Sequence, residues 1–335
     1  MRILVLGGSG YIGKRLVETL HASSWATAVS ASRASQRKET SREFLQLDTC
    51  NEIALRTVLK DFDAVVNCVA GDERSIAVGA RALTQAALAA QCPRIVHLST
   101  MSVYGPAEGD LREDAPMDSR LGWYGRAKCE AETQMAEFVQ EGCQAVVLRP
   151  GCVFGPGSEL WVGRVGRWLQ AGRLGDLGAA GDGWSNLVHV DDVCQAIVAA
   201  LKLPALPGKL PAFNLAAPDS PRWNEYFVDL SFAIKATPVR RLSPRRLRLD
   251  ALLAGRALKV AQMAQKRLGW RRPRLPDPMP PALVRFWQQQ LHMDSTAATR
   301  CLGLSWTPYA MGLQSSVNWF VDSSAKRGAM VCKAA

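Results

Sequence analysis

The sequence lacks any run approaching the roughly 18 apolar residues that cross a bilayer as a helix. It also lacks a basic leader and cleavage site at its start, where the strand-like segment MRILVLGGSGYIG stands. None of its nine cysteines belongs to a C-x-x-C pair, and most lie within apolar runs such as AVVNCVAG. We therefore expect a cytoplasmic protein with buried free thiols, without membrane spans or a disulfide framework.

Acidic residues are nearly missing from one segment. Between Lys235 and Arg274 the chain has thirteen basic residues and one acid, Asp250, so this segment accounts for the whole formal net charge of +11. Part of it has helical spacing. One predicted face carries Leu249, Leu253, Ala257, Val260, Ala264 and Leu268, and another carries most of Arg245, Arg248, Arg256, Lys259 and Lys266.

Three interpretations of the basic segment 240–274 remain open at this stage. It could be a packed helix whose outer face is solvated. It could contact an anionic membrane peripherally, or it could hold an acidic carrier or an anionic substrate such as an acyl thioester.

The order of apolar segments predicts the fold class. Short β-rich runs alternate with longer helical runs over the first 100 residues, which is typical of βαβ units around a parallel sheet. The pattern becomes mainly helical after about residue 220. We predict a doubly wound α/β Rossmann fold over 1–155, to which 184–217 return, and a smaller, mainly helical substrate lobe from 156–183 and 218–335.

A glycine-rich turn follows the first predicted strand. Gly7, Gly10 and Gly13 stand in ILVLGGSGYIGKRLV, where helical sequence follows at once. Gly7 would permit a tight turn, Gly10 would let the backbone approach a pyrophosphate, and Gly13 would allow close packing of helix on strand. We expect this loop, together with Tyr11 and Ile12, to bind a dinucleotide.

The end of the second predicted strand indicates which dinucleotide binds. An acid there would accept the ribose 2′-hydroxyl, whereas an arginine can pair with a 2′-phosphate. The segment TAVSASRAS offers Ser32 and Arg33, and no acid occurs before Glu39. We therefore predict NADP, with NAD as the alternative.

Several motifs together resemble the extended short-chain dehydrogenases/reductases, which include NAD(P)-dependent epimerases and dehydratases. They are GGSGYIG, LDT at 47 to 49, VVNCVAG, VHLSTMSVYG, YGRAK, LRPGCVFGPG and NLVHVDDV. The resemblance extends over most of the chain. Pro150 and the tail after residue 280 look most like the branch of 3β-hydroxysteroid dehydrogenases and related ketone reductases.

The resemblance implies a catalytic set. The family's tyrosine and lysine fall on Tyr124 and Lys128, which stand four residues apart and so share one helix face. The family's hydroxyl residue falls on Thr100, with Ser99 and Ser102 as fallback choices. Lys128 would favour the Tyr124 phenolate and bind the nicotinamide ribose, and in reduction Tyr124 would protonate a carbonyl oxygen that Thr100 holds.

The resemblance also implies further cofactor contacts. Asp48 and Thr49 should lie near the adenine, Cys68, Val69 and Ala70 along the cofactor, and Pro150 and Val153 beside the nicotinamide carboxamide. We expect no metal site, because NLVHVDDV, with His189, Asp191 and Asp192, resembles a structural strand-to-helix junction of the family.

Departures from the family's pattern narrow the activity. Ile76 stands roughly where sugar-nucleotide members carry an asparagine, and Cys152 stands where nucleotide-sugar epimerases typically carry another. Thr100 is followed by Met101 and Ser102, without the acids of the family's dehydratases. These differences argue against dehydration and against a sugar nucleotide.

We therefore predict an NADP-dependent oxidoreductase that interconverts a ketone and a secondary alcohol on a non-sugar substrate, apolar or acyl in character. A nucleotide-sugar epimerase and a non-catalytic dinucleotide-binding scaffold are the alternatives. We expect a homodimer. We also expect it to bind a small-molecule substrate and no nucleic acid.

Overall fold

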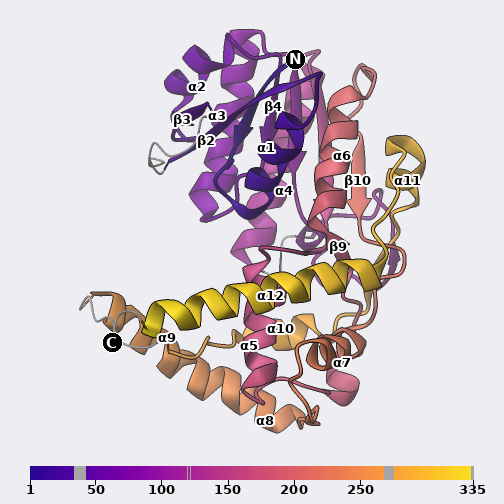
Figure 1. Ribbon diagram of the computed structural model, residues 1–335. Helices are drawn as coiled ribbons and strands as arrows, with labels where there is room; N and C mark the ends of the chain where they lie inside the picture. Colours follow the sequence, from indigo (N-terminus) through magenta and orange to yellow (C-terminus); the bar gives the residue numbers. More distant parts are fainter. Residues whose placement is uncertain (34–42, 119, 121, 268–274, 333–335) are drawn as a thin grey trace. The chain divides into compact units, whose positions relative to one another are not determined.

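The computed structural model describes residues 1–33, 43–118, 120, 122–267 and 275–332, with only the backbone described at 254–256, 266 and 327–332. The chain forms two compact units (Figure 1). The first consists of Met1–Gly151, Val190–Pro218 and Met293–Trp306, and the second of Cys152–His189, Asp219–His292 and Thr307–Ala335.

A seven-stranded sheet forms the centre of the first unit, in the order β10-β7-β5-β4-β1-β2-β3. Every neighbouring pair in it is parallel, and β1 pairs with β2 from Arg2 opposite Thr27 to Leu6 opposite Ala31. The strands are β1 (Arg2–Leu6), β2 (Thr27–Ser32), β3 (Phe44–Gln46), β4 (Ala64–Asn67), β5 (Arg94–Leu98), β7 (Gln144–Pro150) and β10 (Ala212–Leu215). This order confirms the predicted doubly wound α/β fold.

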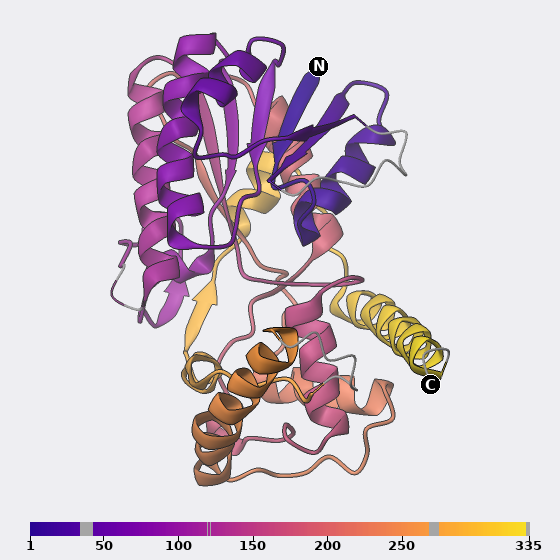
Figure 2. The same cartoon turned by 90° about the vertical axis from the view of Figure 1, so that its left-hand side faces the viewer.

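Two layers of helices cover the sheet, as the side view in Figure 2 shows. On one side α1 (Tyr11–His21) packs against α6 (Val190–Lys202). On the other, α2 (Glu52–Leu59), α3 (Glu73–Ala90) and α4 (Trp123–Gln140) pack in series. The central strands are apolar along nearly their whole length because both faces of the sheet are buried.

The remaining elements of the first unit are short. They are the 3₁₀ turn η1 (Met101–Tyr104), β6 (Gly109–Leu111) and α11 (Thr296–Leu302), while β11 (Leu291–Met293) lies at the boundary of the units. The segment 293–306 belongs to this unit, whereas the sequence analysis assigned it to the substrate lobe. Ser295 fixes it by donating a hydrogen bond of 2.7 Å to the Ala216 carbonyl after β10.

The second unit is mainly helical. Its two strands, β8 (Cys152–Phe154) and β9 (Leu187–His189), form a separate parallel pair and do not extend the main sheet. β9 was predicted to belong to the Rossmann fold, as part of 184–217, and instead lies in this unit. The helical segments are η2 (Glu159–Arg164), α5 (Val165–Gln170), η3 (Gly178–Gly181), α7 (Trp223–Ala233), α8 (Pro244–Leu249), η4 (Asp250–Ala254), α9 (Gly255–Arg267), α10 (Pro281–Phe286) and α12 (Tyr309–Cys332).

Tryptophan side chains build the core of the second unit. Trp168 is 1% exposed, and Trp161 packs at a tilt against Trp223 with ring centroids 5.1 Å apart. Trp287 packs edge-on against Trp168. Trp161 and Trp168 therefore contribute to the packing of this unit. No helix in the described parts of the chain has the length and apolar character needed to span a membrane.

Candidate active site

The glycine loop between β1 and α1 has the close packing that its spacing predicts. Gly7 has φ +73°, a conformation that favours glycine. A Cβ on Gly13 would lie 2.3 Å from the Gly7 carbonyl oxygen, and one on Gly8 would lie 2.4 Å from the Ser30 hydroxyl. Side chains at these positions would push the loop outward, so glycine is required by local packing.

The N-terminus of α1 is suited to an anion. Gly10 is its N-cap residue, and no side chain caps the helix there. Backbone N–H groups in the first turn of a helix lack intrahelical acceptors, and the helix dipole favours a negative charge beside them. A pyrophosphate would supply both the acceptors and the charge, so the loop fits the phosphates of a dinucleotide.

The predicted adenosine residues lie at the ends of neighbouring strands. Thr49 is 7% exposed and packs under Gly79 of α3, whereas Asp48 is exposed and accepts a hydrogen bond of 3.0 Å from the Cys50 amide. Arg33 follows β2, is 59% exposed, and forms a loose ion pair of 3.5 Å with Asp72. An exposed pair of this kind contributes little to stability, so Arg33 can exchange it for another anion. Glu39, the first acid after β2 in the sequence, lies outside the described residues.

Lys128 is held by the carboxyl ends of two strands. Its ammonium group donates hydrogen bonds of 2.6 Å to the Leu98 carbonyl and 3.1 Å to the Val69 carbonyl. Burial lowers the pKa of Lys128 to about 8, and the negative charge of Glu132 acts in the opposite direction. The two carbonyl bonds fix the position of the ammonium group beside the residues predicted to line the cofactor.

Two polar side chains behind Lys128 were not singled out in the sequence. Asn67 accepts a hydrogen bond of 3.1 Å from the Val69 amide, and its amide nitrogen lies 3.2 Å from His97 Nδ1. Burial and the charge of Lys128 hold the pKa of His97 well below its ordinary value, so the imidazole is neutral. This arrangement holds in place the Val69 segment, which provides one of the acceptors of Lys128.

Thr100 lies next to Tyr124, where it lowers the pKa of the phenol. It also caps the turn η1, where its hydroxyl accepts a bond of 3.3 Å from the Ser102 amide and donates one of 3.3 Å to the Ser102 hydroxyl. Ser99 instead donates a bond of 2.5 Å to Glu132, so its hydroxyl is engaged elsewhere. Of the hydroxyl candidates, Thr100 is therefore the one that acts on the Tyr124 phenol.

The phenol of Tyr124 is kept in its neutral form here. Burial raises its pKa, and the hydrogen bond with Thr100 lowers it to a smaller extent. The sequence analysis assigned the tuning of Tyr124 to Lys128, whereas the groups that shift the pKa in this structure are the surrounding protein and Thr100. A protonated phenol is the form that can donate a proton to a carbonyl oxygen.

A buried ion pair supports this site, and it was missed in the sequence. Glu132 continues the face of α4 that carries Tyr124 and Lys128, four residues further on. Its carboxylate accepts a bond of 2.7 Å from Arg149 of β7, and the two side chains are 3% and 7% exposed. Because Glu132 also bonds Ser99, it ties α4 to the ends of β5 and β7. The four-residue spacing of Tyr124, Lys128 and Glu132 could have indicated from the sequence that Glu132 lies on the same helix face.

The network continues beyond Arg149 through polar groups that satisfy one another. Arg149 donates to the Tyr104 hydroxyl at 3.0 Å and to the Glu113 carbonyl at 2.8 Å. Tyr104 in turn donates a bond of 2.5 Å to Asn214 of β10. Buried charges need such partners because an unsatisfied one is costly.

The remaining residues predicted to contact the cofactor are Cys68, Ala70, Pro150 and Val153. Burial raises the pKa of the Cys68 thiol to about 12, so it is not a nucleophile. Ala70 follows directly after Val69. Pro150 ends β7 in the first unit, while Val153 lies in β8 of the second and pairs with Val188.

The junction residues of NLVHVDDV have structural contacts. Asp191 forms an ion pair with Arg15 at 2.5 Å, which joins α6 to α1. His189 lies 3.2 Å from the Ser315 hydroxyl and packs edge-on against Phe154. Within the described ranges, no group of three or more His, Cys, Asp or Glu side chains is placed to hold a metal ion.

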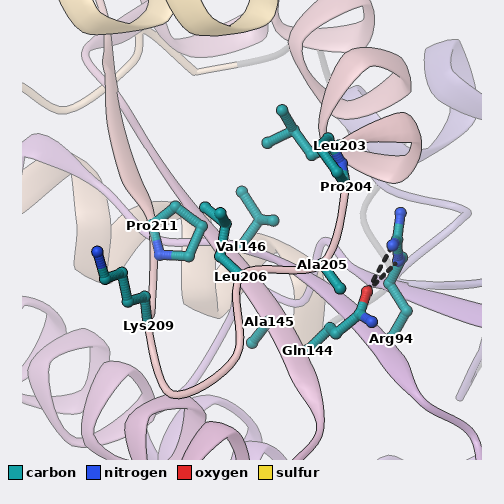
Figure 3. Close-up of a pocket in the computed structure, with 10 residues that line it drawn as sticks. All are labelled: Arg94, Gln144, Ala145, Val146, Leu203, Pro204, Ala205, Leu206, Lys209 and Pro211. Carbon is teal, nitrogen blue, oxygen red and sulfur yellow. Dashed lines mark hydrogen bonds between the residues drawn. The ribbon is translucent and has the colours of Figure 1, made fainter.

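A surface pocket lies elsewhere on the first unit (Figure 3). It is lined by Arg94, Gln144, Ala145, Val146, Leu203, Pro204, Ala205, Leu206, Lys209 and Pro211. Arg94 and Gln144 are the first residues of β5 and β7. The Arg94 guanidinium group donates a hydrogen bond of 3.1 Å to the Gln144 side-chain oxygen at the edge of the pocket. Ligands of open α/β sheets bind at the carboxyl ends of the strands, so this pocket is separate from the candidate active site.

Comparison with known proteins agrees with this geometry. The model of the "NAD dependent epimerase/dehydratase family" matches residues 3–216. Protein YeeZ of Escherichia coli (strain K12) is 28% identical over 254 residues, which cover 71% of this chain and 86% of that protein. The dTDP-6-deoxy-L-talose 4-dehydrogenase (NAD(P)(+)) of Kitasatospora kifunensis is 31% identical over 196 residues, which cover 54% of this chain and 60% of that protein.

A solved structure resembles most of the chain. The UDP-glucuronic acid 4-epimerase from Bacillus cereus, in complex with UDP-glucuronic acid and NAD, superimposes with a TM-score of 0.72 over 96% of this chain and 99% of the other. The sequence identity is 19%, so this likeness shows a shared fold and no more.

Proposed function

The chain belongs to the NAD dependent epimerase/dehydratase family, whose members are NAD(P)-dependent dehydrogenases, epimerases and reductases, and we propose that it interconverts a ketone and a secondary alcohol with NADP. The observation that carries this proposal is the placement of Tyr124 next to Thr100, one helical turn from the buried ammonium group of Lys128, which is fixed on two backbone carbonyls. A relative named as a 4-dehydrogenase supports the reaction type.

Thr100, Tyr124 and Lys128 have separate roles in the proposed reaction. Thr100 holds the substrate oxygen by a hydrogen bond, and Tyr124 gives it a proton in reduction. The bound dinucleotide supplies hydride chemistry at the carbon atom. Lys128, fixed on the Leu98 and Val69 carbonyls, would hold the nicotinamide ribose.

A non-sugar substrate is supported by Ile76. Its side chain is 2% exposed and packs in the core near the start of α3, in place of the asparagine that sugar-nucleotide members of the family present. A buried isoleucine offers no hydrogen bond to a substrate hydroxyl or to ordered water. An apolar or acyl ketone does not need one at that position, whereas a sugar has polar groups that require partners.

The alternative, a nucleotide-sugar epimerase, is separated by cofactor turnover. An epimerase oxidises and re-reduces its substrate within one turnover, so it consumes no added cofactor. We expect added NADPH to be oxidised with a ketone of the accepted class, as measured by its absorbance, and not with nucleotide sugars. Interconversion of a nucleotide sugar without net oxidation of NADPH would show that the epimerase hypothesis is the correct one.

The choice of NADP rests on Arg33. Its exposed guanidinium group stands at the end of β2, where a 2′-phosphate would lie, and its present partner Asp72 is 56% exposed. Arg33→Ala should weaken NADPH binding by about 1.5 to 3 kcal/mol, because one charge-assisted contact is lost, and should barely change NADH binding. Titration of both cofactors by fluorescence measures this difference.

Arg56→Ala provides the control, since this exposed arginine on α2 lies in the same unit and is not predicted to contact the cofactor. Equal losses for NADPH and NADH in Arg33→Ala would remove the assignment of the 2′-phosphate to this residue.

A further inference from the structure

The basic segment after residue 240 forms one long helical stretch in the second unit. α8, the π-helical turn η4 and α9 follow one another without a break from Pro244 to Arg267, as the lower part of Figure 1 shows. Twenty-four residues of helix are about 36 Å long. This stretch contains the apolar and basic faces that the sequence predicted.

The apolar face of this stretch points outward. Leu249, Leu253, Val260 and Met263 are 57%, 67%, 67% and 56% exposed, and they recur at spacings of 4, 7 and 3 residues. The side chains that pack inward near its start are Leu247 and Ala251, each 1% exposed. The main apolar stripe of the stretch therefore faces the solvent, whereas a packed helix would be expected to bury such a stripe.

The basic side chains next to the stripe carry uncompensated charge. Arg245, Arg246, Arg248, Lys259 and Arg267 are exposed, and none of them makes an ion pair with another side chain that the structure describes. Asp250, the one acid between Lys235 and Arg274, instead forms an ion pair of 2.9 Å with Arg173. The outer surface of the stretch therefore presents apolar and positive groups together.

We propose that the outer face of residues 244–267 docks on the surface of an anionic lipid bilayer. A membrane of this kind offers both complements at once, an apolar interior for the leucine, valine and methionine side chains and negative head groups for the basic ones. An acidic protein would match the charges, but it would leave a long, open stripe of aliphatic side chains without a shaped pocket. The inference is independent of the reaction that the first unit catalyses.

Co-sedimentation of the full chain with lipid vesicles tests this proposal. We expect binding to vesicles of equal parts phosphatidylcholine and phosphatidylglycerol, and none to pure phosphatidylcholine. Raising the ionic strength should release most of the protein, because exposed charges act over only about 8 to 10 Å in ordinary buffer.

Two variants separate the two kinds of contact. Leu253→Ser/Val260→Ser/Met263→Ser removes the apolar stripe, and Arg245→Gln/Arg248→Gln/Lys259→Gln removes charge beside it. Each should lower the partition coefficient at least about tenfold. All six side chains are exposed, so both variants should keep the melting temperature of the unmodified protein.

Ile53→Ser/Lys60→Gln is the matched control, because it removes an exposed apolar and a basic side chain around α2 of the other unit. It should bind vesicles as the unmodified protein does. The proposal is overturned if the unmodified protein ignores anionic vesicles, or if the stripe variant still binds them fully. It is also overturned if the stripe variant changes only the oligomeric state, since a second copy of the chain would then be the occupant.

Discussion

Replacing Tyr124 by phenylalanine should reduce turnover at least about 100-fold while cofactor affinity is retained. The substitution removes the hydroxyl that lies next to Thr100 and would protonate the substrate oxygen, and it leaves the aromatic ring in place. The glycine loop is untouched because it lies between β1 and α1. Steady-state kinetics with saturating NADPH, together with a separate titration of NADPH binding, measure the two quantities.

Two further variants test which neighbouring hydroxyl group takes part in the reaction. Thr100→Val should also lower turnover strongly, because it removes the second hydroxyl of the pair. Ser99→Ala should act mainly on stability, since its hydroxyl bonds the carboxylate of Glu132 and not Tyr124. Near-native turnover in Tyr124→Phe would show that another group provides the proton.

Replacing Arg149 by methionine should lower the free energy of unfolding by about 3 to 5 kcal/mol. The change leaves the carboxylate of Glu132, which is 3% exposed, without its charged partner. It also removes the donors to the Tyr104 hydroxyl and the Glu113 carbonyl. Denaturant unfolding followed by circular dichroism gives the loss as a shift of the midpoint.

Arg126→Met is the matched control, since it breaks an ion pair of similar length, 2.6 Å, between side chains that are 52% and 48% exposed. An exposed pair contributes about 0 to 1 kcal/mol, so its loss should be small. The double variant Arg149→Met/Glu132→Leu should recover part of the stability, because it also removes the unpaired carboxylate. Equal effects of Arg149→Met and Arg126→Met would contradict the role assigned to the buried pair.

The Tyr124→Phe and Arg149→Met variants both test how the site is held in place. Tyr124, Lys128 and Glu132 stand on one face of α4, and each meets a group on another element of the first unit. Tyr124 contacts the turn after β5, Lys128 contacts the ends of β4 and β5, and Glu132 contacts β7. The helix is thereby fixed at three successive turns, so the phenol and the ammonium group have defined positions.

The sequence by itself determined the fold class of the first unit and predicted where its candidate site lies. Alternating strands and helices predicted a parallel sheet with helices on its faces, because parallel strands need crossover connections that are usually helical. The glycine spacing after β1 fixed the dinucleotide loop, since Gly13 has no room for a side chain beside Gly7. The spacing of Tyr124 and Lys128 placed both on one helix face.

Only the tertiary structure decided which groups these residues meet. Lys128 bonds the carbonyls of Val69 and Leu98, which are 59 and 30 residues away along the chain. Thr100 acts on the Tyr124 phenol, whereas its neighbour Ser99 bonds Glu132. The stretch 244–267 shows the same limit, since its periodicity identified an apolar face that the folded unit leaves exposed. Periodicity tells which side chains share a face of a helix. The face that packs is decided by distant segments, whose approach the local pattern does not contain.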